Sequence, residues 1–87
     1  MSYTVEYEPE AVKDLKRFNP NIRKRIVTKI DWLAENFENV QPLPLSANLA
    51  GFYKLRVGDY RVIYEFEDAI RVITVDRVGH RSEIYEL

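Results

Sequence analysis

Cysteine is absent from this 87-residue sequence, and histidine occurs only once. Without cysteine the chain has no disulfides, no thiolate metal site and no cysteine nucleophile. A single histidine leaves too few ligands for an evident metal site, so we expect neither a metal nor another cofactor. Any chemistry must come from lysine, arginine, tyrosine, the one histidine and carboxylates.

Long apolar runs are also missing. No stretch approaches the roughly 18 to 20 consecutive apolar residues of a membrane-spanning helix, and the first residues lack the basic region and apolar core of a signal peptide. We therefore expect a cytoplasmic protein that does not bind membranes. With 46% hydrophobic and 31% charged residues, the composition is that of a globular protein with room for one core. Residues 1–87 are expected to form a single domain.

Neither sign of charge is in excess, because 13 basic residues face 14 acidic ones and the net charge is −1. Bulk electrostatics therefore gives no support to nucleic-acid binding. The charges are nevertheless segregated along the chain. Seven basic residues and a single acid, Asp14, lie between Lys13 and Lys29, whereas acids dominate residues 6–10, 31–38 and 65–68. Any affinity for RNA must come from local basic patches such as residues 13–29.

The N-terminal half of the sequence predicts a strand and two helices. Residues 3–7 alternate as a short strand does, and Pro9 suits the first turn of a helix that runs to about Phe18. Asn19 and Pro20 form a start signal for a second helix. Its apolar positions recur every three or four residues, at Ile22, Ile26, Ile30, Leu33 and Phe37. Residues 39–49, with two prolines and no period, indicate a loop.

From Gly51 onward the apolar period changes to two. Residues 52–57, 60–66 and 70–78 predict three consecutive strands, separated by turns at 58–59 and 67–68. Residues 82–85 add either an edge strand or a tail. The fold class is therefore α+β: a strand, a two-helix hairpin, then an antiparallel meander of three to four strands. Both helices are expected to pack on one sheet face, which leaves the opposite face free for polar side chains.

A group of cationic and aromatic side chains is expected on that free face. Side chains two apart on a strand point the same way, and a tight hairpin brings the next strand close to them. We expect Gly79 to break the third strand, so that the residues after it swing back over the sheet. The candidate site residues are Lys54, Arg56, Arg61, His80, Arg81 and Tyr85.

This set of side chains suits the cleavage of RNA without a metal. The reaction needs a base for the 2′-hydroxyl proton, cations for the phosphate oxygens, and an acid for the departing 5′ oxygen. Taken singly, each residue also has an ordinary structural explanation. Two cations on a strand are commonly a solvated face, Arg61 can pair with Asp59 or Glu65, His80 can be a turn residue, and a tyrosine near an edge can pack its ring.

Two segments resemble a known family. Residues 51–64 (GFYKLRVGDYRVIY) are similar to the central signature of the RelE and ParE toxin superfamily, and residues 78–85 (VGHRSEIY) are similar to the ending of RelE-type members. The resemblance implies a type II toxin that cleaves mRNA in the ribosomal A site through 2′-hydroxyl attack, leaving a 2′,3′-cyclic phosphate. It also implies an antitoxin that wraps around the toxin, and contact with operator DNA only through that antitoxin.

The resemblance also assigns roles to the candidate residues. Lys54 is the candidate base or phosphate ligand, and Arg56 and Arg61 stabilise the transition state. His80 or Arg81 supplies the acid, and Tyr85 orients the substrate. The ribosome would position the mRNA.

Two other functions fit the same fold. A ParE-type toxin inhibits DNA gyrase and needs no catalytic residues of its own. A non-toxic remnant would only bind an antitoxin and help to repress transcription.

Overall fold

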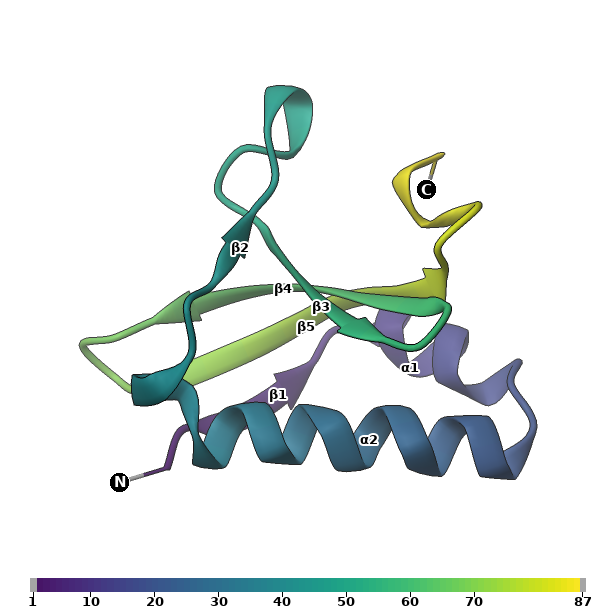
Figure 1. Ribbon diagram of the computed structural model, residues 1–87, viewed down its shortest axis with the longest axis horizontal. Coiled ribbons are helices and arrows are strands. Elements are labelled where there is room, and N and C mark those ends of the chain that lie inside the picture. The colour runs from purple at the N-terminus through teal and green to yellow at the C-terminus, as the bar shows by residue number, and fades with distance from the viewer. Residues whose placement is uncertain (1, 87) are drawn as a thin grey trace.

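The computed structural model describes residues 2–86, with the backbone alone for Glu86; Met1 and Leu87, which the expected single domain includes, lie outside the described residues. Strand β1 (Thr4–Tyr7) leads into helices α1 (Pro9–Lys16) and α2 (Pro20–Glu35), and a loop then leads to strands β2 (Leu43–Pro44), β3 (Tyr53–Val57), β4 (Tyr60–Glu67) and β5 (Val72–His80) (Figure 1). Three short 3₁₀ helices complete the order: η1 (Phe37–Asn39), η2 (Ala47–Leu49) and η3 (Ile84–Glu86). The predicted order of strand, helix hairpin and strand meander is confirmed.

Both α-helices begin where the sequence predicts. Pro9 and Pro20 occupy first-turn positions, where the missing N–H is not needed. Asn19 caps α2, because its side-chain oxygen accepts a hydrogen bond of 3.0 Å from the Ile22 N–H. None of the helices within residues 2–86 is long and apolar enough to cross a membrane.

The sheet has five strands in the order β1-β5-β4-β3-β2. β3, β4 and β5 form the predicted antiparallel meander, and the sequence analysis missed how the other two strands join it. β1 pairs in parallel with β5, from Thr4 opposite Val72 to Tyr7 opposite Val75, because the helix hairpin carries the chain back across the sheet. β2 is only two residues long and pairs with the start of β3. Residues 82–85 form a turn and part of η3, so the expected tail is correct and the edge strand is not.

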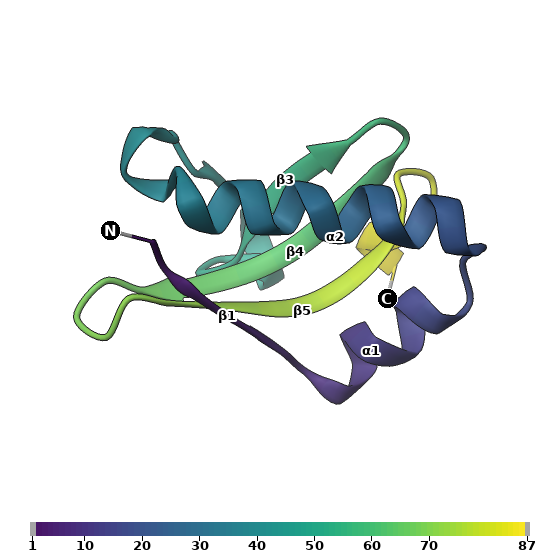
Figure 2. The same ribbon diagram turned by 90° about the horizontal axis from the view of Figure 1, so that it is seen from below.

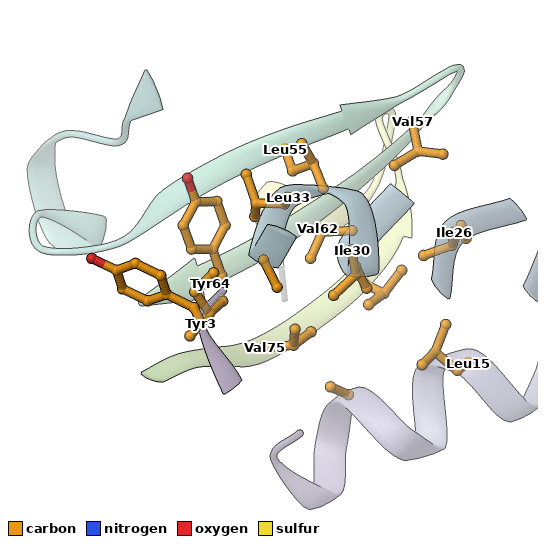
Figure 3. Packing of buried hydrophobic residues seen from close by; sticks show 14 of the residues in the cluster. Tyr3, Leu15, Ile26, Ile30, Leu33, Leu55, Val57, Val62, Tyr64 and Val75 are labelled. Atoms are coloured by element: carbon orange, nitrogen blue, oxygen red, sulfur yellow. The ribbon is translucent and has the colours of Figure 1, made fainter. Parts of the chain in front are cut away.

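The main core lies between the two helices and one face of the sheet. In Figure 2, α2 crosses over β3 and β4, and α1 lies near the C-terminal end of β5. Leu55, Val62 and Val75 point from the sheet toward Ile26 and Ile30 of α2, and all five are buried (Figure 3). Burial of these side chains stabilises the fold by roughly 25 cal/mol for each Å² of apolar surface removed from water. The expected arrangement of both helices on one face is confirmed.

Asp14 of α1 forms hydrogen bonds with the part of β5 that extends beyond β1. It is only 1% exposed, and it accepts hydrogen bonds from the Val78 N–H (2.8 Å) and from Arg77 Nε (2.9 Å). Arg17 Nη2 lies 2.6 Å from the same carboxylate. Burial alone would raise the pKa of Asp14, but these hydrogen bonds and the two guanidinium charges outweigh it and lower the pKa. The backbone N–H of an otherwise unpaired strand edge is thereby satisfied.

Two features of β5 affect the sheet face that the helices leave uncovered. The register with β4 shifts between Ile63, which faces Arg77, and Tyr64, which faces Val75, so Asp76 is the additional residue of a β-bulge. The prediction that Gly79 breaks the strand is wrong. β5 runs through Gly79 to His80 because Gly79 pairs with Arg61, and the chain turns only at residues 81–83.

Candidate active site

A hollow of about 490 Å³ opens on the helix-free face, between the β3–β4 hairpin and the C-terminal turn. In Figure 1 this C-terminal turn rises from the end of β5 on the side of the sheet away from α2. The expected convergence of the six candidates is what the structure has, although the path of the chain after Gly79 differs. The residues lining this cationic hollow are Lys54, Arg56, Arg61, His80, Arg81, Ser82 and Tyr85.

Strand alternation and register place three of the cations. Leu55 and Val62 face each other in the core, so their neighbours point to the opposite face. Arg56 lies directly across the hairpin from Arg61, and Lys54 is one step further along the same face of β3. Directly opposed like charges on a sheet are destabilising, so this arrangement is not explained by stability.

The β3–β4 turn holds Arg61 in place. Its Nη1 donates hydrogen bonds of 2.8 Å to the carbonyl oxygens of both Gly58 and Tyr60. Arg61 therefore does not pair with Asp59 or Glu65, the alternative that its position suggested. Gly58 has φ of 58°, and a Cβ there would lie 2.1 Å from Arg25 Nη2 of α2. The left-handed backbone favours glycine in this turn, and the missing side chain leaves room for the Arg25 guanidinium.

The C-terminal turn is attached to the same hairpin. The Arg81 N–H donates a hydrogen bond of 2.8 Å to the Asp59 carbonyl oxygen. The side chains of the two residues form a looser pair, with Arg81 Nε 3.7 Å from the carboxylate and both side chains more than 60% exposed. Such an exposed pair contributes little to stability and leaves the guanidinium free to exchange its partner. The backbone bond keeps Arg81 next to the hollow.

His80 lies at the end of β5 and contacts both strand and turn. Its ring packs edge-on against Tyr60, with centroids 5.6 Å apart. Nδ1 accepts a hydrogen bond from the Ser82 N–H (3.2 Å) and lies 2.8 Å from Ser82 Oγ. A neutral histidine whose Nδ1 accepts carries its proton on Nε2. Ser82 was missed by the sequence analysis, since only the histidine contact distinguishes it from any turn serine.

Tyr85 is held at the edge of the hollow by its neighbour. Ile84 is 1% exposed on the sheet, whereas the Tyr85 side chain is 45% exposed. Both belong to η3, so burial of one residue fixes the backbone that presents the other. The phenol has no side-chain hydrogen bond within residues 2–86, so it is available to a ligand.

The charge of the cationic hollow is unbalanced. Among the side chains that the structure describes, its lining includes four cations and no carboxylate. Within residues 2–86, neither Lys54 nor Arg56 has a side-chain hydrogen bond or ion pair. Cations gathered without acids make a site for an anion whose charge is spread over several oxygens, such as a phosphate.

The positive surface continues beyond the cationic hollow. Arg56 also lines a neighbouring hollow together with Arg25, Lys29 and Trp32 of α2, where Lys29 Nζ lies 3.9 Å from the Trp32 ring centroid. Arg25 and Lys29 belong to the basic run 13–29. Sequence patterns alone do not show which members of that run lie near β3, because this depends on how the helix crosses the sheet.

No three histidine, aspartate or glutamate side chains gather as metal ligands anywhere in residues 2–86. The hollow thus offers hydrogen-bond donors and cations. Such a lining suits the binding of a phosphate group.

The chain is similar to known toxins along almost all of its length. A family model, the ParE toxin of the type II toxin-antitoxin system parDE, matches residues 5–85. Toxin RelG of Mycobacterium tuberculosis is 34% identical over 89 residues, which covers 98% of each chain.

Solved structures give the same result. The toxin-antitoxin complex RelBE2 of M. tuberculosis contains a chain 31% identical to this one, with a TM-score of 0.84 and 94% of each chain covered. A mutant of Escherichia coli toxin RelE in the free state is 26% identical, with a TM-score of 0.75 and coverage of 99% of this chain and 93% of its own. The chain therefore belongs to the RelE/ParE superfamily and is a toxin of the type II toxin-antitoxin kind.

Proposed function

We propose that this toxin is a metal-independent endoribonuclease that cuts mRNA in the ribosomal A site and so inhibits translation. The observation that carries the proposal is the convergence of Lys54, Arg56, Arg61, His80, Arg81 and Tyr85 on one hollow, to which no carboxylate of residues 2–85 contributes. Four of these residues are cations, and the others add an imidazole and a phenol. They cover each task of phosphodiester cleavage.

The reaction begins at the 2′-hydroxyl of the nucleotide 5′ to the cut. Lys54 takes the hydroxyl proton or binds the phosphate, and the 2′ oxygen attacks phosphorus. The bond from phosphorus to the 5′ oxygen breaks, which leaves a 2′,3′-cyclic phosphate on one fragment and a 5′-hydroxyl on the other. His80 in its imidazolium form, which gives up the Nε2 proton and becomes neutral, or Arg81 protonates the departing oxygen, and Tyr85 orients the substrate.

Arg56 and Arg61 stabilise the charge that builds up on the phosphate oxygens. Arg61 is already oriented by the carbonyls of Gly58 and Tyr60, both of which bind Nη1, so its remaining N–H groups can face the substrate. A fixed guanidinium loses less side-chain entropy when it binds phosphate in two places. Arg81 joins by exchanging its exposed contact with Asp59 for the phosphate.

The partners follow from the family and from the size of the site. The ribosome positions the mRNA, because a hollow of about 490 Å³ holds little more than one nucleotide. A cognate antitoxin keeps the toxin inactive, as a RelB-type partner is present in the M. tuberculosis RelBE2 structure. Operator DNA is reached only through that antitoxin. We place this activity in the cytoplasm and assign it to one toxin domain, residues 1–87.

Cleavage on translating ribosomes tests the proposal directly. Purified toxin is added to a ribosome-containing translation extract, and cut sites on the mRNA are mapped by primer extension. We expect cuts at codons in the A site, which disappear when Arg61 is replaced by alanine. Intact mRNA at toxin concentrations that arrest translation in the extract would contradict the proposal.

Gyrase inhibition is the second candidate function, because the matching family model is that of the ParE toxin. A toxin of that type needs no phosphate-binding cations on the helix-free face. A supercoiling assay run in parallel distinguishes the two functions. Inhibition of gyrase with mRNA left intact would favour the ParE type, and expression without any effect on growth would favour a non-toxic remnant.

A further inference from the structure

A second hollow lies beside the cationic hollow on the same face of the sheet. Its volume is about 310 Å³, and its apolar lining is formed by Leu49, Phe52, Ile63 and Ile84. Ile63 and Ile84 are buried but lie outside the main core cluster, so the helix-free face has a small apolar centre of its own. In Figure 1 the segment around η2 and the C-terminal turn both stand on this side of the sheet.

The polar part of this apolar-acidic hollow is mostly acidic. Glu8 and Glu10 line it from the β1–α1 junction, and Asp76 lines it from the bulge in β5. Its one cation, Arg77, is held by two hydrogen bonds to Asp14 of 2.9 and 3.1 Å. Glu10 forms an exposed pair with Lys13 at 3.5 Å, so Glu8 and Asp76 are the lining acids without a cation partner within residues 2–85.

Asp76 has a carboxyl group that is only partly satisfied. Its Oδ2 is buried and has no hydrogen-bond partner within residues 2–86. Burial first, and then the neighbouring Glu65 carboxyl of β4 and the charge of Glu8, raise the pKa of Asp76 to about 7. A buried polar oxygen without a partner is uncommon in folded proteins, and a cation bound in the hollow that Asp76 lines would favour the ionised carboxylate.

We propose that the apolar-acidic hollow is an anchor site for an arginine side chain of a protein partner. The aliphatic stem would lie along Phe52, Ile63 and Ile84, and the guanidinium would meet the carboxylates of Asp76 and Glu8. Arginine fits this combination because its stem is apolar and its planar head binds carboxylates in two places. Three carboxylates around the opening disfavour RNA, whose phosphates would be repelled.

Because the anchor site lies beside the cationic hollow, a partner bound there would interfere with RNA binding. Ile63 pairs across the hairpin with Lys54, and Ile84 directly precedes Tyr85, so the two hollows share a wall. A partner segment anchored by its arginine would lie next to the cations and obstruct a bound RNA strand. Binding at the anchor does not depend on the proposed nuclease function, whereas this consequence does.

Two small molecules test the anchor without any RNA. n-Butylguanidinium has the stem and head of arginine, and n-butylurea has the same shape without the charge. Each is titrated into ¹⁵N-labelled toxin at pH 6 and pH 8, and backbone amide shifts are followed. We expect n-butylguanidinium to shift the amides of Ile63, Asp76 and Ile84, and to bind about threefold or more tightly at pH 8, because the cation favours ionised Asp76 over its neutral form. n-Butylurea should bind at least about fivefold more weakly.

Substitutions of single acids distinguish binding in the hollow from a general attraction of the cation to the protein's negative charge. Asp76→Asn should weaken n-butylguanidinium binding about fivefold or more and remove its dependence on pH, and Glu8→Gln should weaken it less. Glu67→Gln, at the exposed end of β4, is the matched control and should leave binding unchanged. Equal binding of n-butylurea, or undiminished binding to both Asp76→Asn and Glu8→Gln, would overturn the proposal. So would guanosine 5′-monophosphate shifting the same amides more strongly than the cation, which would make the hollow a nucleotide pocket.

Discussion

The cationic hollow and the apolar-acidic hollow lie side by side on one face of the same sheet, yet they are built in opposite ways. The first gathers cations that are exposed or half-buried. Arg61 binds backbone carbonyls, Arg81 makes a loose pair with Asp59, and neither Lys54 nor Arg56 has a side-chain hydrogen bond or ion pair within residues 2–85. The second buries isoleucines and carries the acid with the most strongly raised carboxyl pKa, Asp76. One pair of strand partners, Lys54 and Ile63, marks the boundary between them.

From this difference we expect that the cations of the first hollow matter for activity and the buried isoleucines of the second matter for stability. Removing an exposed cation deprives a ligand of its partner and leaves the core unchanged. Removing a buried isoleucine leaves a cavity that the fold must tolerate. Mutations in the two hollows should therefore fall into two separate classes, one that changes activity and one that changes stability.

The largest expected effect is on stability, from Ile84→Ala in the apolar-acidic hollow. Ile84 is 1% exposed and fixes η3 to the sheet. We expect its truncation to lower the free energy of unfolding by about 3 kcal/mol, because transfer and cavity terms add. Urea denaturation followed by circular dichroism measures this. A loss below about 1 kcal/mol would show that η3 does not depend on this side chain.

Arg61→Ala and Tyr85→Ala should have the next largest effect, on activity alone. Each is expected to lower the rate of mRNA cleavage about a hundredfold or more, which corresponds to about 2.7 kcal/mol of transition-state stabilisation. Both variants should unfold within about 1 kcal/mol of the parent protein, since neither side chain is buried in the core. Glu67→Gln is again the control. Full cleavage by both variants would mean that the cations of the hollow have no part in catalysis.

Asp76→Asn should increase stability, and the increase should depend on pH. The pKa of Asp76 is about 7 in the folded protein and ordinary in the unfolded chain, so the folded state binds more protons between about pH 4 and pH 7. The parent protein therefore loses stability as pH rises through this window, and the variant does not. We expect the variant to be about 1 kcal/mol more stable at pH 8, allowing for solvent screening.

Thermal unfolding at pH 5 and pH 8 checks the prediction for Asp76. The melting temperature of Asp76→Asn should exceed that of the parent by several degrees at pH 8, and the difference should shrink at pH 5. A variant less stable than the parent at pH 8 would mean that the carboxylate has a stabilising partner, which would also weaken the anchor proposal.

The smallest expected effect belongs to Asp59→Asn at the rim of the cationic hollow. The ion pair with Arg81 is long and exposed, so its loss should cost less than about 0.5 kcal/mol. The backbone bond between the Arg81 N–H and the Asp59 carbonyl persists in the variant. A loss above about 1 kcal/mol in urea denaturation would show that the side-chain pair, and not the backbone, attaches the C-terminal turn.

Local patterns were enough to predict much of this molecule. Pro9, Asn19 and Pro20 mark the helix starts, and the period of two after Gly51 predicts the meander. Alternation placed Lys54 and Arg56 on the helix-free face together with Arg61 across the hairpin. These predictions succeed because strand pleat and helix caps depend on neighbouring residues alone.

Other features depend on contacts between distant residues and could not be read from the pattern. The parallel pairing of β1 with β5 depends on where the helix hairpin returns the chain. The bulge at Asp76 and the burial of Asp14 depend on which side chains meet across elements. Gly79 was misread because glycine suits both a break and a paired strand position, and only its partner Arg61 distinguishes the two.

The attack by the 2′-hydroxyl is the claim on which the function of the cationic hollow depends. Ribosomes carrying an mRNA with a single 2′-deoxynucleotide on the 5′ side of the cut test it in one measurement, against the same mRNA with ribose at that position. We predict cleavage of the ribose mRNA with a 2′,3′-cyclic phosphate end, and no cleavage of the deoxy mRNA. Equal cleavage of both, or cleavage of neither by toxin that arrests translation, would contradict the account.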